Sequence, residues 1–231
     1  MEGITVIIPV FNEEKNLVKL LPQLHSIISS CCSSYELLVV DSKKSLDNTK
    51  AVCEKHNAIY VKQAGSGYAD AFKTGINVAG FDAIIVVDGD CSQDVFKIPL
   101  MYNAYKNGSD VVIGSRYTYG GKSNDPIISR MMSKTLNLVY RLVFGLEQRD
   151  ISTDFRIYHK NQLQRIKMKC VNFDVIEETL ILLKRNNPDL IVTEIPIDYR
   201  PREQGYSKRR LFLFVWDYIK LIFRLVKDHS I

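Results

Sequence analysis

Residues 83–87 form an unbroken apolar run that ends at Asp88-Gly89-Asp90. A short aliphatic run without polar alternation is typical of a strand buried on both faces, in the middle of a parallel sheet. The two carboxylates then stand at the sheet edge where open α/β folds bind ligands. Hard oxygen ligands there suit Mg²⁺ or Mn²⁺, and a bound divalent ion suits a diphosphate. Asp and Gly are also ordinary turn residues, so these residues alone leave a solvated acidic turn equally open.

Strand-like apolar runs alternate with segments of helical periodicity, which predicts an α/β fold with a largely parallel sheet flanked by helices. We expect strands at residues 4–10, 37–40, 58–61, 83–87, 110–113, 154–158 and 190–195, and helices at 17–28, 46–56, 68–76, 127–144, 175–183 and 211–227. Asn12 is a candidate cap for the first helix. Most strands end in polar residues or glycine, so several loops should converge on one crevice.

The composition permits one large domain, because 46% of the 231 residues are hydrophobic. We expect this domain to cover residues 1–205, with a basic loop and a C-terminal amphipathic helix at 206–231. The five cysteines have neither zinc-site spacing nor a disulfide framework, which favours a reducing, cytoplasmic setting. The chain enters a strand almost at once and has no apolar segment of spanning length, so we expect no signal peptide and no membrane span.

The net charge of +5 is modest and unevenly spread. A basic cluster near the C-terminus consists of Arg200, Arg202, Lys208, Arg209 and Arg210. Such a cluster indicates a local anionic partner and not a nucleic acid. The loop at residues 202–208 is either a solvated linker or a mobile loop that folds over an anionic substrate.

The last predicted helix is apolar and aromatic apart from one polar stripe. The stripe consists of Asp217, Lys220, Arg224 and Lys227, which recur every three to four residues. Such a helix either packs in a core or dimer interface, or lies in a membrane interface with its aromatic side buried. The neighbouring basic loop favours the membrane surface, at the cytoplasmic face.

Two further motifs have functional and structural interpretations. Gly65 and Gly67 before a helix resemble a dinucleotide fingerprint, but Asp70 occupies the third glycine position and the match is incomplete. Arg116 follows a strand and is either ion-paired to a carboxylate or a clamp for a phosphate. Arg130 and Ser133 could share that phosphate or face solvent.

The order of seven motifs identifies a resemblance that covers nearly the whole chain. They are residues 6–13 (VIIPVFNE), 38–41 (LVVD), 67–75 (GYADAFKTG), 87–90 (VDGD), 113–117 (IGSRY), 150–156 (DISTDFR) and 202–208 (REQGYSK). The chain resembles the inverting family 2 glycosyltransferases of GT-A fold, which is built on a Rossmann-like sheet. Within that family it is most similar to the dolichyl- or polyprenyl-phosphate hexose synthases, of the dolichyl-phosphate mannosyltransferase type.

The resemblance implies a role for each matching position. The donor nucleotide-sugar pocket would contain Pro9, Val10, Asn12, Glu13, Asp41, Lys73 and Asp88. Mg²⁺ or Mn²⁺ would be held by Asp88, Asp90 and Ser92, and the catalytic acidic residues would be Asp88, Asp90 and Asp150. The acceptor phosphate would be bound by Arg116, Arg130, Ser133, Arg202 and Lys208.

The implied reaction is metal-dependent, inverting transfer of a hexose from GDP- or UDP-hexose to a dolichyl or undecaprenyl phosphate. The C-terminal helix or a membrane partner subunit would supply membrane contact, since we expect the chain to lack the hydrophobic C-terminal membrane domain of many relatives. The chain departs from the family after Asp41, where a further acidic residue is usual, as in Asp-Asp-Gly-Ser; here Ser42-Lys43-Lys44-Ser45 follows, which bears on recognition of the base and ribose. It also has Ser92 where a glutamine is frequent, with Gln93 beside it.

Three other functions are compatible with parts of this pattern. One is a transferase that acts on a sugar hydroxyl, for which Asp150 would be the general base. A second is a non-catalytic nucleotide-sugar or membrane-binding module, suggested by the two lysines after the second strand. A third is a Rossmann oxidoreductase, which would require a nicotinamide cofactor.

Overall fold

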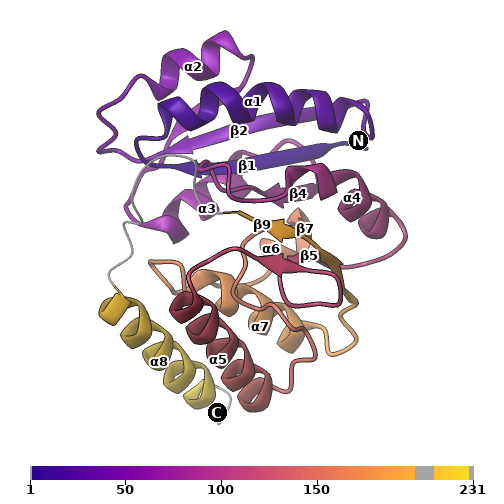
Figure 1. Cartoon of the computed structure of the whole chain (residues 1–231), viewed down its shortest axis with the longest axis vertical. Helices are drawn as coiled ribbons and strands as arrows, with labels where there is room; N and C mark the ends of the chain where they lie inside the picture. Colours follow the sequence, from indigo (N-terminus) through magenta and orange to yellow (C-terminus); the bar gives the residue numbers. More distant parts are fainter. Residues whose placement is uncertain (1, 201–210, 229–231) are drawn as a thin grey trace.

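The computed structural model describes residues 2–200 and 211–228, and a seven-stranded sheet runs through its centre (Figure 1). The strand order is β3-β2-β1-β4-β7-β5-β8. These strands are β1 (Ile4–Val10), β2 (Tyr35–Asp41), β3 (Ile59–Lys62), β4 (Ala83–Val86), β5 (Val111–Ser115), β7 (Arg156–His159) and β8 (Val192–Pro196). All neighbours are parallel except that β7 is antiparallel to both β4 and β5, which confirms the mostly parallel sheet.

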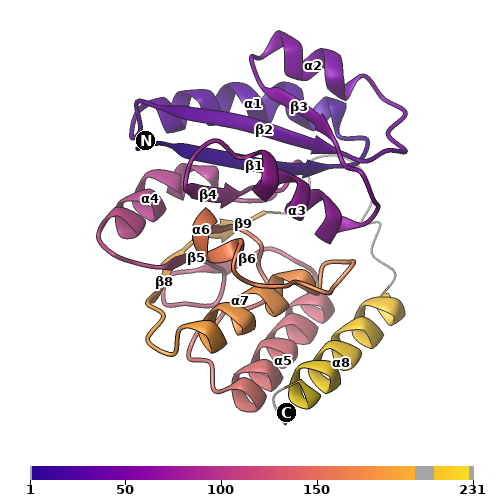
Figure 2. The ribbon, with the colours of Figure 1, turned by 180° about the vertical axis from the view of Figure 1, so that it is seen from behind.

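Helices cover both faces of this sheet (Figures 1 and 2). They are α1 (Glu14–Ser29), α2 (Thr49–Lys55), α3 (Tyr68–Val78), α4 (Ile98–Lys106), α5 (Ile127–Phe144), α6 (Lys160–Leu163), α7 (Val175–Asn186) and α8 (Leu211–Lys227), with a short 3-10 turn at Val95–Lys97. Strand β1 shows why two layers form: Val6 and Ile8 pack with α1 and α4, whereas Ile7 packs with α3. The alternation of side chains along a strand therefore supplies apolar contacts to both layers.

Several local features differ from the sequence prediction. Helices α4 and α6, the 3-10 turn and a small two-stranded sheet, β6 (Lys122–Ser123) with β9 (Asp198–Tyr199), are additional. Asn12 does not cap α1: Glu13 occupies the cap position, and Asn12 has a positive φ of 56°. The Asn12 side-chain oxygen instead accepts a hydrogen bond from the Leu46 amide at 2.9 Å, so it holds the loop after β2.

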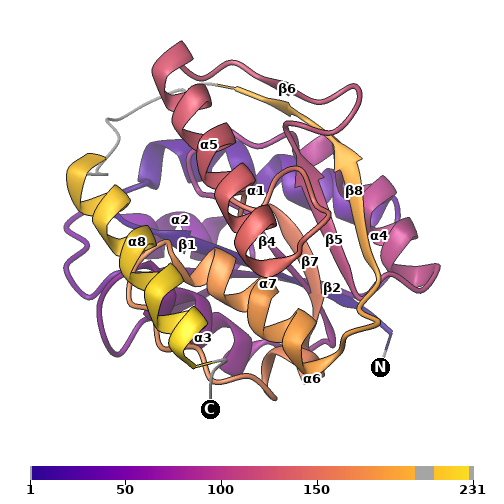
Figure 3. The same ribbon diagram turned by 90° about the horizontal axis from the view of Figure 1, so that it is seen from below.

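Helix α8 packs beside α5 on the lower part of the molecule (Figures 1 and 3). Tyr218, Leu221 and Leu225 are buried in the core, and the Tyr140 hydroxyl of α5 donates to the Tyr218 carbonyl at 3.3 Å. The opposite side of α8 leaves Phe223 73% exposed. None of the described helices is both long enough and apolar enough to cross a membrane. The expected boundary between residues 205 and 206 lies outside the described residues.

Candidate active site

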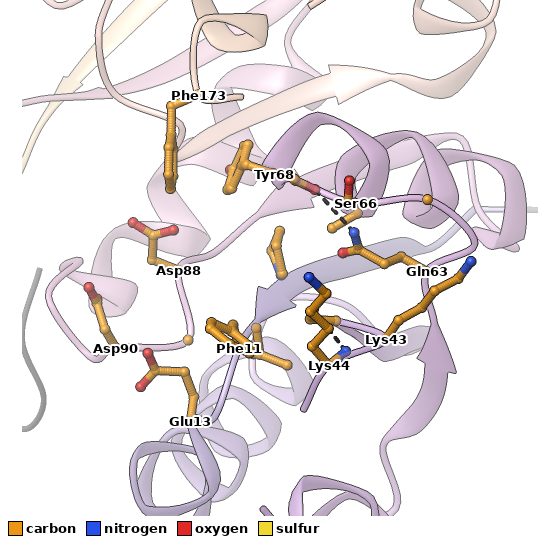
Figure 4. A pocket seen from close by; sticks show the side chains of 17 residues that line it. Phe11, Glu13, Lys43, Lys44, Gln63, Ser66, Tyr68, Asp88, Asp90 and Phe173 are labelled. Atoms are coloured by element: carbon orange, nitrogen blue, oxygen red, sulfur yellow. Dashed lines mark hydrogen bonds between the residues drawn. The ribbon is translucent and has the colours of Figure 1, made fainter. Parts of the chain in front are cut away.

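A pocket of about 690 Å³ opens at the carboxyl ends of β1, β2 and β4 (Figure 4). Its acidic side carries Glu13, Asp88 and Asp90, and its basic side carries Lys43 and Lys44. Aromatic side chains form further parts of the wall, namely Phe11, Tyr68 and Phe173. The pocket therefore combines apolar surface with two separate groups of charges, which suits an elongated ligand with distinct polar parts.

The acidic side is built on the turn that follows β4. Gly89 permits this turn to approach β1, because a Cβ there would lie 2.7 Å from the Cγ1 of Val10. The Ser92 amide donates to the Asp90 carboxylate at 3.0 Å and fixes the end of the turn. Both aspartate side chains line the pocket, as the sequence predicted for a ligand-binding turn.

The donor set of this turn fits a hard divalent cation. Within residues 2–200 and 211–228, no cluster of three or more acidic, cysteine or histidine side chains is arranged to hold a metal ion. Magnesium is commonly bound through one or two carboxylates together with substrate phosphates and water. Asp88 and Asp90 are the residues of this turn that could hold such an ion.

A polar network supports the acidic turn from behind. The Gln93 side chain accepts a hydrogen bond from the Asp88 amide at 3.1 Å and donates to Asp154 at 2.8 Å. Asp154 also accepts a hydrogen bond from the Tyr68 hydroxyl at 2.7 Å, and the Tyr68 ring stacks on Phe173 with centroids 4.4 Å apart. Burial, followed by the charge of Asp154, raises the pKa of Tyr68 well above its ordinary value. The network thus connects the aromatic wall to the main chain of Asp88.

Of the remaining residues expected in the donor pocket, two line it and the others do not. Pro9 and Val10 line the pocket. Asp41 is 1% exposed beneath it and accepts a hydrogen bond from the Tyr60 hydroxyl at 3.0 Å; burial raises the pKa of Asp41. Lys73 donates to the Cys170 carbonyl at 3.4 Å, so it contacts another loop of the protein.

A second polar cluster surrounds the side chain of Arg116. Its guanidinium donates to both oxygens of Asp150 at 2.8 Å, and also to Ser152 at 2.8 Å and Ser133 at 3.3 Å. Burial opposes ionisation of Asp150, but the charge and hydrogen bonds of Arg116 outweigh it and lower the Asp150 pKa. The ion-paired alternative for Arg116 is therefore present in this structure, with Ser133 beside it.

Tyr199 lies near both the Arg116 cluster and the acidic turn. The Arg116 guanidinium lies 5.4 Å from the centroid of its ring. Burial, and after it the negative charges of Asp88 and Asp90, raise the pKa of Tyr199. Tyr199 thus contacts the Arg116 cluster, and its neighbour Arg200 reaches the end of the acidic turn, where its amide donates to the Ser92 carbonyl at 2.9 Å.

Other residues expected at the acceptor are distributed around this cluster. Arg130 lies on α5 one turn before Ser133 and donates to the Ser123 carbonyl at 3.4 Å. Ser92, which was expected as a metal ligand and not at the acceptor, is buried and does not line the pocket. Arg202 and Lys208 lie outside the described residues.

The sequence matches the family model for glycosyl transferase family 2 over residues 5–167. The chain belongs to glycosyl transferase family 2. The resemblance found in the sequence is therefore confirmed, and the family membership excludes an oxidoreductase.

Two curated relatives are named for transfer to lipid phosphates. The chain is 29% identical over 232 aligned positions to dolichol-phosphate mannosyltransferase from Pyrococcus furiosus, covering 97% of this chain and 64% of that protein. It is 31% identical over 216 positions to polyprenol monophosphomannose synthase from Mycolicibacterium smegmatis, covering 88% of this chain and 79% of that protein. This glycosyltransferase therefore spans just under two thirds of the length of the Pyrococcus relative.

A solved structure confirms the fold. Glucosyl-3-phosphoglycerate synthase from Mycobacterium tuberculosis, crystallised with Mn²⁺, UDP and glucosyl-3-phosphoglycerate, has a TM-score of 0.76 and 15% sequence identity. The match covers 97% of this chain and 79% of that protein. The family 2 enzyme described here has the GT-A fold that its motifs predicted.

The hydrogen-bond network behind Asp88 can be tested by exchanging the amide of Gln93 and the carboxylate of Asp154. Gln93→Glu places a second carboxylate against Asp154, and we expect a loss of about 1–3 kcal/mol in unfolding free energy near neutral pH. Adding Asp154→Asn should restore most of this loss, because the new amide at position 154 can donate to the new carboxylate at position 93. Urea unfolding at pH 7 measures both changes.

The matched control is Gln164→Glu, which adds a carboxylate at an exposed position. Its unfolding free energy should change by about 0.5 kcal/mol or less. If the double variant loses as much unfolding free energy as the two single variants lose together, Gln93 and Asp154 do not act as a pair.

Proposed function

We propose that this enzyme transfers a hexose from a nucleotide sugar to a polyprenyl phosphate by a single, inverting displacement that requires Mg²⁺ or Mn²⁺. The observation that carries the proposal is the place of the Arg116 cluster against Tyr199, whose neighbour Arg200 is bonded to Ser92 at the end of the acidic turn. One region suits a metal-bound diphosphate and the other a phosphate anion. The names of the two curated relatives support the same acceptor class.

On the donor side, Asp88 and Asp90 would hold the cation against the diphosphate. The bound metal would stabilise the negative charge that develops on the departing nucleoside diphosphate. Gln93 keeps the main chain of Asp88 in place through its hydrogen bond, so the carboxylate is oriented before the donor arrives. Lys43 and Lys44 would face the base and ribose on the opposite side of the pocket.

On the acceptor side, Arg116, Arg130 and Ser133 would orient the phosphate in line with the anomeric carbon. A phosphate monoester is anionic at neutral pH, so its attack does not need a dedicated general base. Asp150 is poorly suited to that task, because Arg116 lowers its pKa and occupies both of its oxygens. This pairing favours a phosphate acceptor over a sugar hydroxyl, and gives Asp150 the role of positioning Arg116.

The metal-binding proposal predicts the effect of removing one carboxylate. Asp90→Asn should lower the rate of hexose transfer by about a hundredfold or more, since charge stabilisation of the leaving group is lost. The assay measures organic-extractable label from nucleotide sugars with a short polyprenyl phosphate and saturating Mn²⁺. Asp94→Asn, on the same loop outside the donor pocket, is the control and should retain activity. Full activity of Asp90→Asn would refute the metal role of this residue.

The acceptor proposal predicts a selective change in kinetics. Arg130→Ala should raise the KM for a short, water-soluble polyprenyl phosphate by about tenfold, the effect expected on losing one charge-assisted contact of about 1.4 kcal/mol. The KM for the nucleotide sugar should stay unchanged, because Arg130 is not part of the donor pocket. Arg165→Ala removes an exposed arginine elsewhere and serves as the control. Equal effects on both KM values would contradict acceptor binding by Arg130.

We further propose that α5 and α8 lie against the surface of a membrane, where a lipid acceptor is found. Helices α5 and α8 lie side by side (Figure 3). Helix α5 exposes a row of apolar side chains that includes Ile128, Met131 and Leu142, and α8 exposes Phe223. Such a surface is typical of helices that lie in a lipid interface. Arg130, Lys134 and Arg141 form a row beside the apolar one on α5, and this row would attract anionic headgroups. The proposed location is peripheral, at the cytoplasmic face, with or without a membrane partner subunit.

A charge placed on this surface should weaken membrane binding. Leu142→Glu should reduce co-sedimentation with vesicles of anionic phospholipid several-fold, because a carboxylate resists burial among acyl chains and is repelled by the headgroups. Leu100→Glu, which changes a 54% exposed leucine on α4, is the matched control and should bind as the unchanged protein does. Equal vesicle binding by the two variants would show that α5 is not the contact surface.

A further inference from the structure

We propose that Arg224 on α8 is a positioning residue for the donor pocket, and that it acts through residues 169–173, here called the bridging segment. This inference rests on the proposed donor pocket. It adds a residue of the C-terminal helix to those that hold the pocket wall in position. The bridging segment lies between α6 and α7 and carries Phe173, which is part of the pocket wall. Its two sides contact different parts of the molecule.

On one side, the bridging segment is held by a buried carboxylate that pairs with Arg224. Glu178 is 1% exposed and accepts hydrogen bonds from the main-chain amides of Lys169 and Cys170, both at 2.9 Å. The Arg224 guanidinium donates to the same carboxylate at 2.7 Å and to the Cys170 sulfur at 2.9 Å. A buried carboxylate is costly without a cation, so Arg224 stabilises the arrangement that orders this segment.

Two exposed contacts attach the bridging segment to α8 at other points. The Asn172 side chain donates to Asp217 at 3.0 Å, and Lys169 forms an ion pair with Asp228 at 3.0 Å. Exposed pairs of this kind contribute little on their own. The partly buried Arg224 contact is therefore the one expected to control the position of the segment.

On its other side, the bridging segment contacts the start of α3, which borders the donor pocket. The Ala69 amide donates to the Val171 carbonyl at 3.1 Å. Gly67 makes this approach possible, since a Cβ there would lie 2.4 Å from the same carbonyl oxygen. Phe173 then stacks on Tyr68, whose hydroxyl is bonded to Asp154. The segment thus sets the position of the aromatic wall.

These contacts predict how a loss of Arg224 reaches the donor. Val171 and Asn172 are exposed, so the bridging segment depends on its neighbours for order. Without the guanidinium, Glu178 holds the segment less firmly, and Phe173 and Tyr68 sample more positions. A nucleotide that binds must then restore their order, and this entropic cost lowers its affinity. The aspartates of the acidic turn remain in place, so the effect should fall on binding and not on the chemical step.

The experiment measures UDP and GDP binding to the full chain by calorimetry in the presence of Mn²⁺. Arg224→Ala should raise the Kd of the nucleotide that binds by about tenfold, which corresponds to about 1.4 kcal/mol. Lys227→Ala removes an exposed cation from the same helix and should change the Kd by less than about twofold. Amide hydrogen exchange should become faster in residues 169–173 of Arg224→Ala, and stay unchanged in the control.

A double-variant cycle separates this role from general destabilisation. In a Phe173→Ala background, Arg224→Ala should change the Kd by less than about twofold, because the ring through which it acts is gone. A tenfold effect that persists in this background would overturn the proposal, as would an unchanged Kd in Arg224→Ala. Glu178→Gln should weaken binding in the same way if Arg224→Ala does not fold. Failure of the unaltered protein to bind either nucleotide would instead refute the proposed function, and the inference with it.

Discussion

The site depends on the requirement that a buried charge be paired. Asp150 has no exposed surface and is held by two hydrogen bonds from the Arg116 guanidinium. Glu178 is held by Arg224 and by two main-chain amides, and Asp154 by an amide and a hydroxyl. Because an unpaired buried carboxylate is so unfavourable, each of these groups fixes the position of its partners. The pairs connect elements that the sheet alone would leave separate.

The fold and the acidic turn were predictable because both follow from local patterns. The apolar run before Asp88 specifies a buried strand, and a carboxyl edge of a parallel sheet follows from the alternation of strands and helices. The network of Gln93, Tyr68 and Asp154 was not predictable, since its members are up to 86 residues apart in the chain. Asp154 stands inside a recognised motif, which was the available signal. Its contacts depend on β7 entering the sheet antiparallel between β4 and β5.

The direction in which side chains point could not be predicted from the sequence either. Asp41 ends β2 as expected, yet its side chain is buried and bonded to Tyr60. Lys73 is on the expected helix, but its ammonium group reaches the Cys170 carbonyl. A one-residue difference in position along a strand or helix changes the face to which a side chain points. Motif matching therefore located the pocket, whereas packing decided which members of the motifs line it.

The unusual loop after β2 changes the electrostatics of that pocket. Lys43 and Lys44 place two positive charges opposite the carboxylates of Glu13, Asp88 and Asp90 (Figure 4). In a nucleotide sugar the diphosphate joins the nucleoside to the sugar. A divalent ion on the acidic side of the pocket can bind this diphosphate. In the proposed binding mode the base and ribose would extend toward the lysines, which donate hydrogen bonds and accept none.

This arrangement favours bases that present carbonyl oxygens to the two ammonium groups, and disfavours edges rich in amino donors. Guanine and uracil meet that condition at their keto groups, and adenine presents an amino group instead. The departure from the usual acidic loop is thus compatible with GDP- or UDP-hexose as donor.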